Sequence, residues 1–153
     1  MKIAFIGTGL MGYPMAKNLI NKKINLKVFS RTLEKAKPLE KLGATIANSL
    51  GEAVKDADII ITMLTDDEAV EKVLGNQEFL NNLKTSSIVI DMSSIKPKIA
   101  IQYGKLFKDR NIHFLDAPVS GGTIGAEEGS LAIMVGGDQN VFDGAFDILK
   151  IMG

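Results

Sequence analysis

The chain has 153 residues, of which 46% are hydrophobic, with 18 basic and 18 acidic side chains and no cysteine. This length and apolar content suit one domain with a substantial core, and we expect a single domain over residues 1–153. The balanced charge excludes a broad field for nucleic acid or an anionic membrane, so neither is an expected partner. The lack of cysteine and the single histidine, His113, exclude a thiolate or multi-histidine metal site.

The first apolar run begins at Lys2, and the longest apolar stretches have only the length of a strand. The sequence has no charged leader followed by a cleavage site. We therefore expect a cytoplasmic protein without a membrane span.

Apolar runs rich in β-branched residues alternate with stretches of helical periodicity. The predicted strands cover residues 2–6, 26–30, 44–47, 58–64, 86–92, 112–118 and 131–136. The predicted helices cover residues 10–23, 32–42, 49–56, 66–74, 96–109 and 138–152. The runs at 58–64 and 87–91 are apolar on both faces, which is typical of central parallel strands covered by helices. The predicted fold is α/β, a doubly wound, mostly parallel Rossmann-type sheet with helices on both faces.

Gly7, Gly9 and Gly12 follow the first strand in the spacing that opens a dinucleotide-binding βαβ unit. In such a unit the first glycine permits the tight turn, the second lets backbone approach the pyrophosphate, and the third lets the helix pack closely. The N-terminus of that helix then faces an anion. A plain turn without a ligand is the alternative, but the strand before the motif and the helix and strand after it favour a nucleotide site.

The end of the second predicted strand carries Ser30, Arg31 and Thr32 instead of the acidic residue that favours NAD. A guanidinium can pair with a 2′-phosphate through its planar fork. The chain has only two arginines, Arg31 and Arg110, so one at this position is notable. We predict that NADPH is preferred and that NAD is possible. The alternative is that Ser30 or Thr32 caps the next helix and Arg31 is merely solvated.

Residues 116–137 hold a strand end, a predicted loop with several glycines and a further apolar strand. Ser120 with the backbone of Gly121 and Gly122 can form a small nest for an anion, such as a carboxylate oxygen of a substrate. A flexible turn between strands is the alternative, because glycine clusters are common in turns.

With both glycine motifs, the chain resembles the β-hydroxyacid dehydrogenase family. The family includes 3-hydroxyisobutyrate dehydrogenases, tartronate semialdehyde reductases, glyoxylate/succinic semialdehyde reductases and, more distantly, 6-phosphogluconate dehydrogenase. The similarity rests on residues 7–19, 30–32, 63–64, 91–94, 116–122 and 125–126.

The resemblance implies a set of site residues. The cofactor would contact Gly7, Thr8, Gly9, Leu10, Met11, Gly12, Ser30, Arg31, Thr32, Leu64, Thr65 and Ser94. The substrate carboxylate would be held by Ser120, Gly121 and Gly122. Many relatives have proline where this chain has Thr65, which we expect to be a mild departure.

Relatives continue beyond a segment like residues 148–153 into an all-helical domain that carries their catalytic lysine. We therefore expect an isolated cofactor domain that lacks the C-terminal helical domain and has no catalytic residue, because the family lysine would lie beyond Gly153. Lys96, Lys98 and Lys105 are typical solvated lysines, and His113 is expected to be structural.

The resemblance implies an NADP-dependent oxidoreductase that acts on the CH–OH group of a small hydroxy acid, or on a semialdehyde or glyoxylate-type acid. The full-length parent would be active and this chain alone inactive. One alternative is a non-catalytic dinucleotide-binding or interaction module. Another is an imine reductase, which would not be expected to keep the motif at residues 116–122. The face normally covered by the helical domain predicts self-association, so we expect a homo-oligomer.

Overall fold

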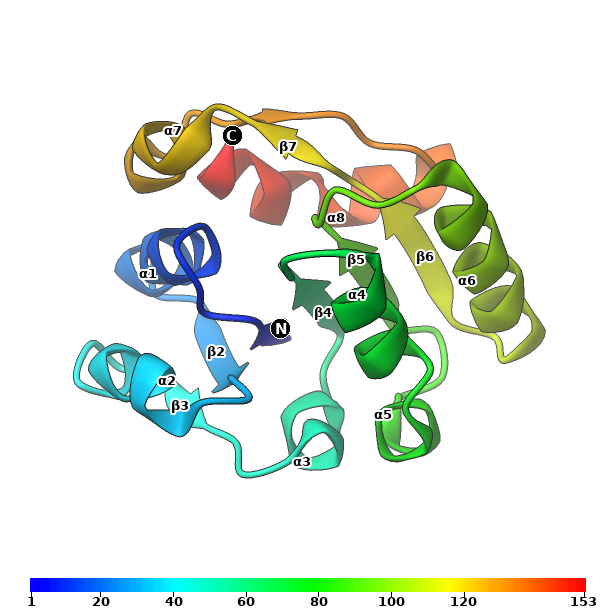
Figure 1. Ribbon diagram of the computed structural model, residues 1–153, viewed down its shortest axis with the longest axis horizontal. Coiled ribbons are helices and arrows are strands. Elements are labelled where there is room, and N and C mark those ends of the chain that lie inside the picture. Colours follow the sequence, from blue (N-terminus) through cyan, green and yellow to red (C-terminus); the bar gives the residue numbers. More distant parts are fainter.

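The computed structural model describes residues 1–153 and contains a six-stranded parallel sheet between two layers of helices (Figure 1). The strands lie in the order β3-β2-β1-β4-β5-β6. Because the chain winds outward from β1 on one side and from β4 on the other, the predicted doubly wound α/β fold is confirmed. The strands are β1 (Lys2–Ile6), β2 (Asn25–Phe29), β3 (Thr45–Ile46), β4 (Ile59–Thr62), β5 (Ile88–Asp91) and β6 (His113–Asp116).

Both faces of the sheet are covered, and the side chains of the strands alternate between two hydrophobic clusters. In β4, Ile59 and Ile61 belong to one cluster and Ile60 to the other. The first cluster is covered by α1 (Gly12–Asn21), α2 (Leu33–Glu40) and α8 (Gln139–Met152). The second is covered by α3 (Leu50–Val54), α4 (Asp67–Leu74), α5 (Gln77–Asn82) and α6 (Pro97–Asp109).

The turn from β1 into α1 depends on two glycines. Gly7 has a φ of 100°, and a Cβ there would collide with the carbonyl oxygen of Met63. A Cβ on Gly12 would collide with the carbonyl oxygen of Gly7. The tight turn and the close helix packing predicted for these positions are therefore present.

The region after β6 differs from the prediction. The predicted glycine loop is wrong, because residues Gly122–Glu128 form a helix, α7. The predicted strand 131–136 shrinks to β8 (Ala132–Ile133), which pairs antiparallel with β7 (Val119–Ser120) outside the main sheet. The helix forms because close packing outweighs the low helix propensity of glycine: Gly125 and Ala126 are buried, and a Cβ on Gly125 would lie 3.1 Å from Leu131 Cδ2.

Two further helices differ from the prediction. Helix α5 was not predicted. Asn76 caps it by accepting a hydrogen bond from the Phe79 N–H at 3.0 Å, and Phe79 and Leu80 are buried. Helix α2 is shorter than predicted and contains Pro38 in its interior. None of the helices is long and apolar enough to span a bilayer.

Candidate functional site

Five strands end in register at one edge of the sheet. Across this edge Phe29, Ile6, Thr62, Asp91 and Asp116 are successive Cα partners, and each is the last residue of its strand. The segments that follow these strands, residues 7–12, 30–32, 63–65, 92–94 and 117–122, form what we term the carboxyl edge. Every predicted cofactor and substrate residue lies in these segments. The carboxyl ends of parallel strands are where open α/β sheets bind ligands.

The N-terminus of α1 has the features of a phosphate-binding turn. No side chain caps this helix and its first turn has no acidic residue, so no carboxylate of the first turn accepts hydrogen bonds from the backbone N–H groups there. A Cβ on Gly9 would meet nothing within 4 Å, so the backbone at Gly9 faces open space. Thr8 is buried, and its Oγ1 has no hydrogen-bond partner. These residues fit a dinucleotide phosphate.

The segment after β2 places Ser30 inside the fold and Arg31 outside it. Ser30 is 7% exposed, whereas Arg31 and Thr32 are exposed. Thr32 occupies the N-cap of α2, but its side chain makes no capping hydrogen bond. Capping by this hydroxyl therefore does not explain the motif. Arg31 forms no ion pair within the chain, so its guanidinium is free to meet an external anion.

A chain of hydrogen bonds joins the segments after β4 and β5. The Thr62 and Ser93 hydroxyls each donate to Asp91 Oδ1 at 2.7 Å. Ser93 Oγ in turn accepts a hydrogen bond from the Leu64 N–H at 2.8 Å. The backbone positions of Leu64 and Ser94, both predicted to line the cofactor, are thus tied to one buried carboxylate.

Asp91 and its neighbour Asp116 are unusual acids. Asp91 is fully buried, and burial raises its pKa to about 6, despite the hydrogen bonds from Thr62 and Ser93 and with a further increase from the charge of Asp116. Burial also raises the pKa of Asp116. Asp91 Oδ2 and Asp116 Oδ1 are buried without a hydrogen-bond partner.

The predicted substrate segment lies at the start of α7. Gly121 and Gly122 have φ values of 138° and 63°, conformations that side chains rarely adopt. Asn18 Nδ2 on α1 donates to the Ala126 carbonyl at 2.8 Å, so α7 is anchored to the helix of the glycine motif. Figure 1 shows α7 beside α1. The structure thus places Ser120, Gly121 and Gly122 on the same side of the fold as the glycine turn; their role in holding a carboxylate stays a prediction.

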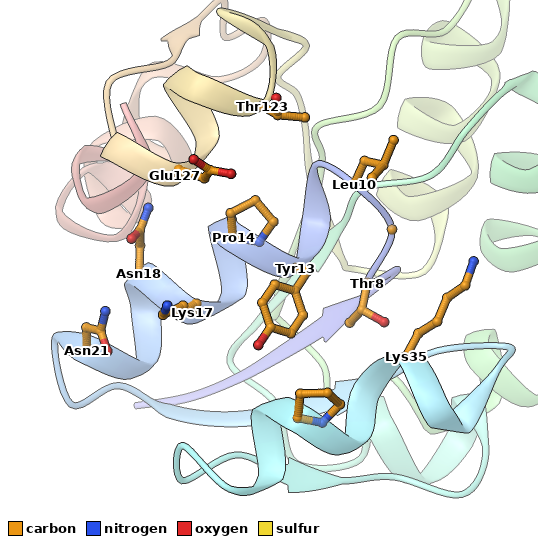
Figure 2. A pocket seen from close by; sticks show the side chains of 12 residues that line it. Thr8, Leu10, Tyr13, Pro14, Lys17, Asn18, Asn21, Lys35, Thr123 and Glu127 are labelled. Carbon is orange, nitrogen blue, oxygen red and sulfur yellow. The ribbon is translucent and has the colours of Figure 1, made fainter.

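A surface hollow of about 830 Å³ lies beside the glycine turn, between α1, α2 and α7 (Figure 2). Thr8, Gly9 and Leu10 form one side of it, Lys35 rises from α2, and Thr123 and Glu127 approach from α7. The segments 63–65 and 92–94 do not line it. The hollow therefore borders the glycine turn and does not coincide with the whole carboxyl edge.

The remaining sequence candidates lie elsewhere or at the surface. His113 is the exposed first residue of β6, at the amino end of the strand. Lys96, Lys98 and Lys105 are exposed, and Lys96 Nζ lies 3.8 Å from Asp67. No group of three or more His, Asp or Glu side chains is placed to hold a metal ion.

Reasoning from the sequence missed the roles of Thr62, Asp91 and Ser93. A signal was present: an aspartate ends the apolar run 87–91, and a serine follows two positions later. A charged residue at the end of a buried strand needs hydrogen-bond partners. Which partners it finds depends on the pairing of β4 with β5, which the sequence does not state.

Comparisons with known proteins agree with this geometry. The family described as the NAD binding domain of 6-phosphogluconate dehydrogenase matches residues 2–153. The uncharacterized oxidoreductase YkwC of Bacillus subtilis is 40% identical over 152 residues, covering 99% of this chain and 53% of that protein. A probable mitochondrial 3-hydroxyisobutyrate dehydrogenase of Dictyostelium discoideum is 40% identical over 152 residues, covering 99% of this chain and 47% of that protein.

Solved structures give the same fold. The 3-hydroxyisobutyrate dehydrogenase of Mycobacterium tuberculosis, solved with L-serine, matches 99% of this chain and 52% of its own with a TM-score of 0.94 and 35% identity. Psf3, solved with NADP+ and 2-OPP, matches 98% of this chain and 54% of its own with a TM-score of 0.94 and 28% identity. An imine reductase of Myxococcus stipitatus in complex with NADP+ covers 100% of this chain and 53% of its own with a TM-score of 0.91, and at 24% identity it shows the fold alone.

The chain spans about half the length of these relatives, and the match lies within a domain that binds a nicotinamide dinucleotide in oxidoreductases. The glycine turn, the sheet order and the uncapped N-terminus of α1 are the structural counterparts of that match. The chain belongs to the family of NAD binding domains of 6-phosphogluconate dehydrogenase.

Proposed function

We propose that the chain is the NADP-binding domain of a β-hydroxyacid dehydrogenase or semialdehyde reductase. The observation that carries the NADP preference is the exposed, unpaired Arg31, two residues beyond the end of β2, in a segment where an acidic residue would favour NAD. The free Arg31 side chain supports a contact with the 2′-phosphate. A charge-assisted contact of about 1.5–3 kcal/mol corresponds to a roughly ten- to hundredfold preference for NADPH.

The residues of the carboxyl edge have separate roles in this proposal. The backbone at Gly7, Gly9 and Gly12 holds the pyrophosphate at the N-terminus of α1. Leu64, Thr65 and Ser94 lie along the nicotinamide half. The bound nicotinamide supplies the hydride donor or acceptor. The chain's own residues bind and orient it.

The substrate in this proposal is a small hydroxy or aldehyde acid whose carboxylate is held by Ser120, Gly121 and Gly122. Two matched proteins support a small acid: one solved structure contains L-serine, and one relative is named as a probable 3-hydroxyisobutyrate dehydrogenase. Transfer of hydride to a carbonyl also needs a proton donor at its oxygen. Since Lys96, Lys98 and Lys105 are exposed, we propose that this donor is a lysine outside residues 1–153.

Self-association is part of the same proposal. Leu10 before α1, Ile124 on α7 and Met134 after β8 are 84%, 69% and 52% exposed, and a second copy of the chain could cover this apolar surface. We expect oligomers of this chain in light scattering. A monomer at high concentration would contradict this part of the proposal.

The cofactor proposal is tested by calorimetric titration with NADPH and NADH. We expect tighter binding of NADPH, and Arg31→Ala is expected to reduce NADPH affinity about ten- to hundredfold while leaving NADH affinity nearly unchanged. Arg110→Ala, at the exposed end of α6, is the matched control and is expected to bind both like the wild type. Tight NADH binding with no effect of Arg31→Ala would contradict the preference.

An imine-reductase activity has less support. The structural match to an imine reductase shows the fold alone. The segment 116–122, which the resemblance links to carboxylate recognition, is present in this chain. A non-catalytic interaction module would be favoured only if neither dinucleotide bound.

A further inference from the structure

Three side chains form a polar row across the otherwise apolar end of the sheet. Thr62, Asp91 and Asp116 are successive partners on β4, β5 and β6. They lie on the face that Ile60, Val89 and Phe114 share, two residues earlier in each strand, and which α4 and α6 cover. The row is therefore built into the sheet and is not part of a flexible loop.

The two carboxylates of this row belong to paired residues, Asp91 and Asp116, on the adjacent strands β5 and β6. Neighbouring strands lie roughly 5 Å apart, and the side chains of paired residues point to the same face. Asp91 Oδ2 and Asp116 Oδ1 are buried, and neither oxygen has a hydrogen-bond partner within the chain. An unpaired buried carboxylate oxygen is costly, and the negative charge of Asp116 disfavours ionisation of Asp91.

No other charge offsets this repulsion. On the β4 side Asp91 meets the neutral hydroxyl of Thr62, and the segment after β5 presents the hydroxyl of Ser93. The charged residues at the N-caps and first turns of α4 and α6 are Asp66, Asp67, Glu68, Lys96 and Lys98. Both lysines are exposed, and Lys96 is paired with Asp67 at 3.8 Å. Asp116 is the charged group that acts on Asp91.

We propose that Asp91 and Asp116 form a carboxyl–carboxylate pair that binds one proton between them, and that this proton controls how firmly Asp91, through Ser93, holds the Leu64 backbone. Without the proton, Asp91 Oδ1 accepts charge-assisted hydrogen bonds from Ser93 and Thr62, which are roughly twice as strong as neutral ones. With the proton on Oδ2, Oδ1 becomes a weaker acceptor and the Leu64 segment is held less firmly. Asp91 is thus a positioning residue; its effect on cofactor binding rests on the proposed function.

The pair itself can be tested without any cofactor. Carbon-13 NMR of the aspartate carboxyls against pH is expected to show Asp91 titrating well above an ordinary aspartate, and Asp116→Asn is expected to lower the Asp91 midpoint by about 0.5–1 unit. The amide proton of Leu64 should follow the same midpoint, and this response should be absent in Asp91→Asn. Asp147→Asn, an exposed acid on α8, is the matched control and should leave both titrations unchanged.

The consequence for binding is tested with NAD+, which lacks the 2′-phosphate whose own titration near pH 6 would interfere. We expect affinity to fall about fivefold between pH 7.5 and pH 5 in the wild type, and to be weak and independent of pH in Asp91→Asn. An Asp91 carboxyl that titrates near pH 4 and ignores Asp116→Asn would overturn the inference. So would a Leu64 amide that does not respond to pH. Failure of NAD+ to bind at any pH would instead count against the proposed function, while the carboxyl titrations would still decide the pair.

Discussion

The backbone N–H of Leu64 donates a hydrogen bond to Ser93 Oγ at 2.8 Å, so the segment after β4 is fastened to the segment after β5. Ser93 is fully buried, and its hydroxyl donates a hydrogen bond to Asp91 Oδ1. In this way one hydroxyl joins the segments that follow the neighbouring strands β4 and β5. The shape of that edge therefore depends on a side chain that does not itself face the outside.

Replacing Ser93 by alanine leaves the Leu64 N–H without its acceptor. The expected loss is about 1–3 kcal/mol in the free energy of unfolding, measured by urea denaturation, with weaker cofactor binding in calorimetry. Ser94→Ala is the matched control, because Ser94 is exposed. It should change stability by less than about 0.5 kcal/mol. Equal stability of the two variants would contradict a bridging role for Ser93.

Two glycines of the turn are expected to matter for different reasons: Gly12 for packing of the fold and Gly9 for dinucleotide binding. Gly12→Ala places a Cβ against the carbonyl oxygen of Gly7 and is expected to lower the free energy of unfolding by about 2–4 kcal/mol. Gly9→Ala meets no atom within 4 Å, so the fold should remain intact while dinucleotide binding falls at least about tenfold. Circular dichroism melting and calorimetry report the two effects. Cofactor binding by Gly9→Ala at the level of the wild type would show that the backbone at Gly9 does not approach the ligand.

The hydrogen bond from Asn18 to the Ala126 carbonyl is expected to hold α7 against α1. Asn18→Ala should reduce the free energy of unfolding by about 1 kcal/mol and increase amide hydrogen exchange in residues 122–128. Asn21→Ala, at the exposed end of the same helix, is the control. Unchanged exchange in α7 after Asn18→Ala would mean that hydrophobic packing alone anchors this helix.

Stability should depend on pH through Asp91, whose pKa is raised to about 6 by burial. Between about pH 4 and pH 6 the folded chain binds more protons than the unfolded chain, so the free energy of unfolding falls as the pH rises, by up to about 3 kcal/mol. Asp58 acts with the opposite sign, because the hydrogen bonds from Lys84 and from the Lys2 backbone N–H lower its pKa. The stability that Asp58 contributes is therefore lost only in stronger acid. Asp91→Asn should lose most of the decline between pH 4.5 and pH 6.5 in urea denaturation. A slope equal to that of the wild type would rule out Asp91 as its source.

Much of the fold follows from the sequence because its signals are local. The alternation of strands and helices and the spacing of Gly7, Gly9 and Gly12 each depend on neighbouring residues, and they correctly predicted a doubly wound sheet. The predicted site residues also lie together at the carboxyl edge, because each follows the end of a strand and the strands run parallel.

The errors of prediction arose where contacts between residues far apart in the sequence determine the structure. Gly125 disfavours a helix locally, but α7 packs closely on Leu131, and a Cβ at this position would lie 3.1 Å from Leu131 Cδ2. Likewise, the link between Thr62 and Asp91 joins residues 29 positions apart, and it becomes visible only when β4 and β5 are paired. Local propensity cannot reveal either arrangement.

Amide NMR mapping with NADPH tests most directly whether the carboxyl edge is the cofactor site. The account predicts perturbed amides at Gly9 and Met11 in the glycine turn and at Arg31 after β2. It also predicts them at Leu64 after β4 and at Ser94 after β5. Perturbations restricted to the hollow lined by Lys17, Lys35 and Glu127, with Leu64 and Ser94 unchanged, would contradict it.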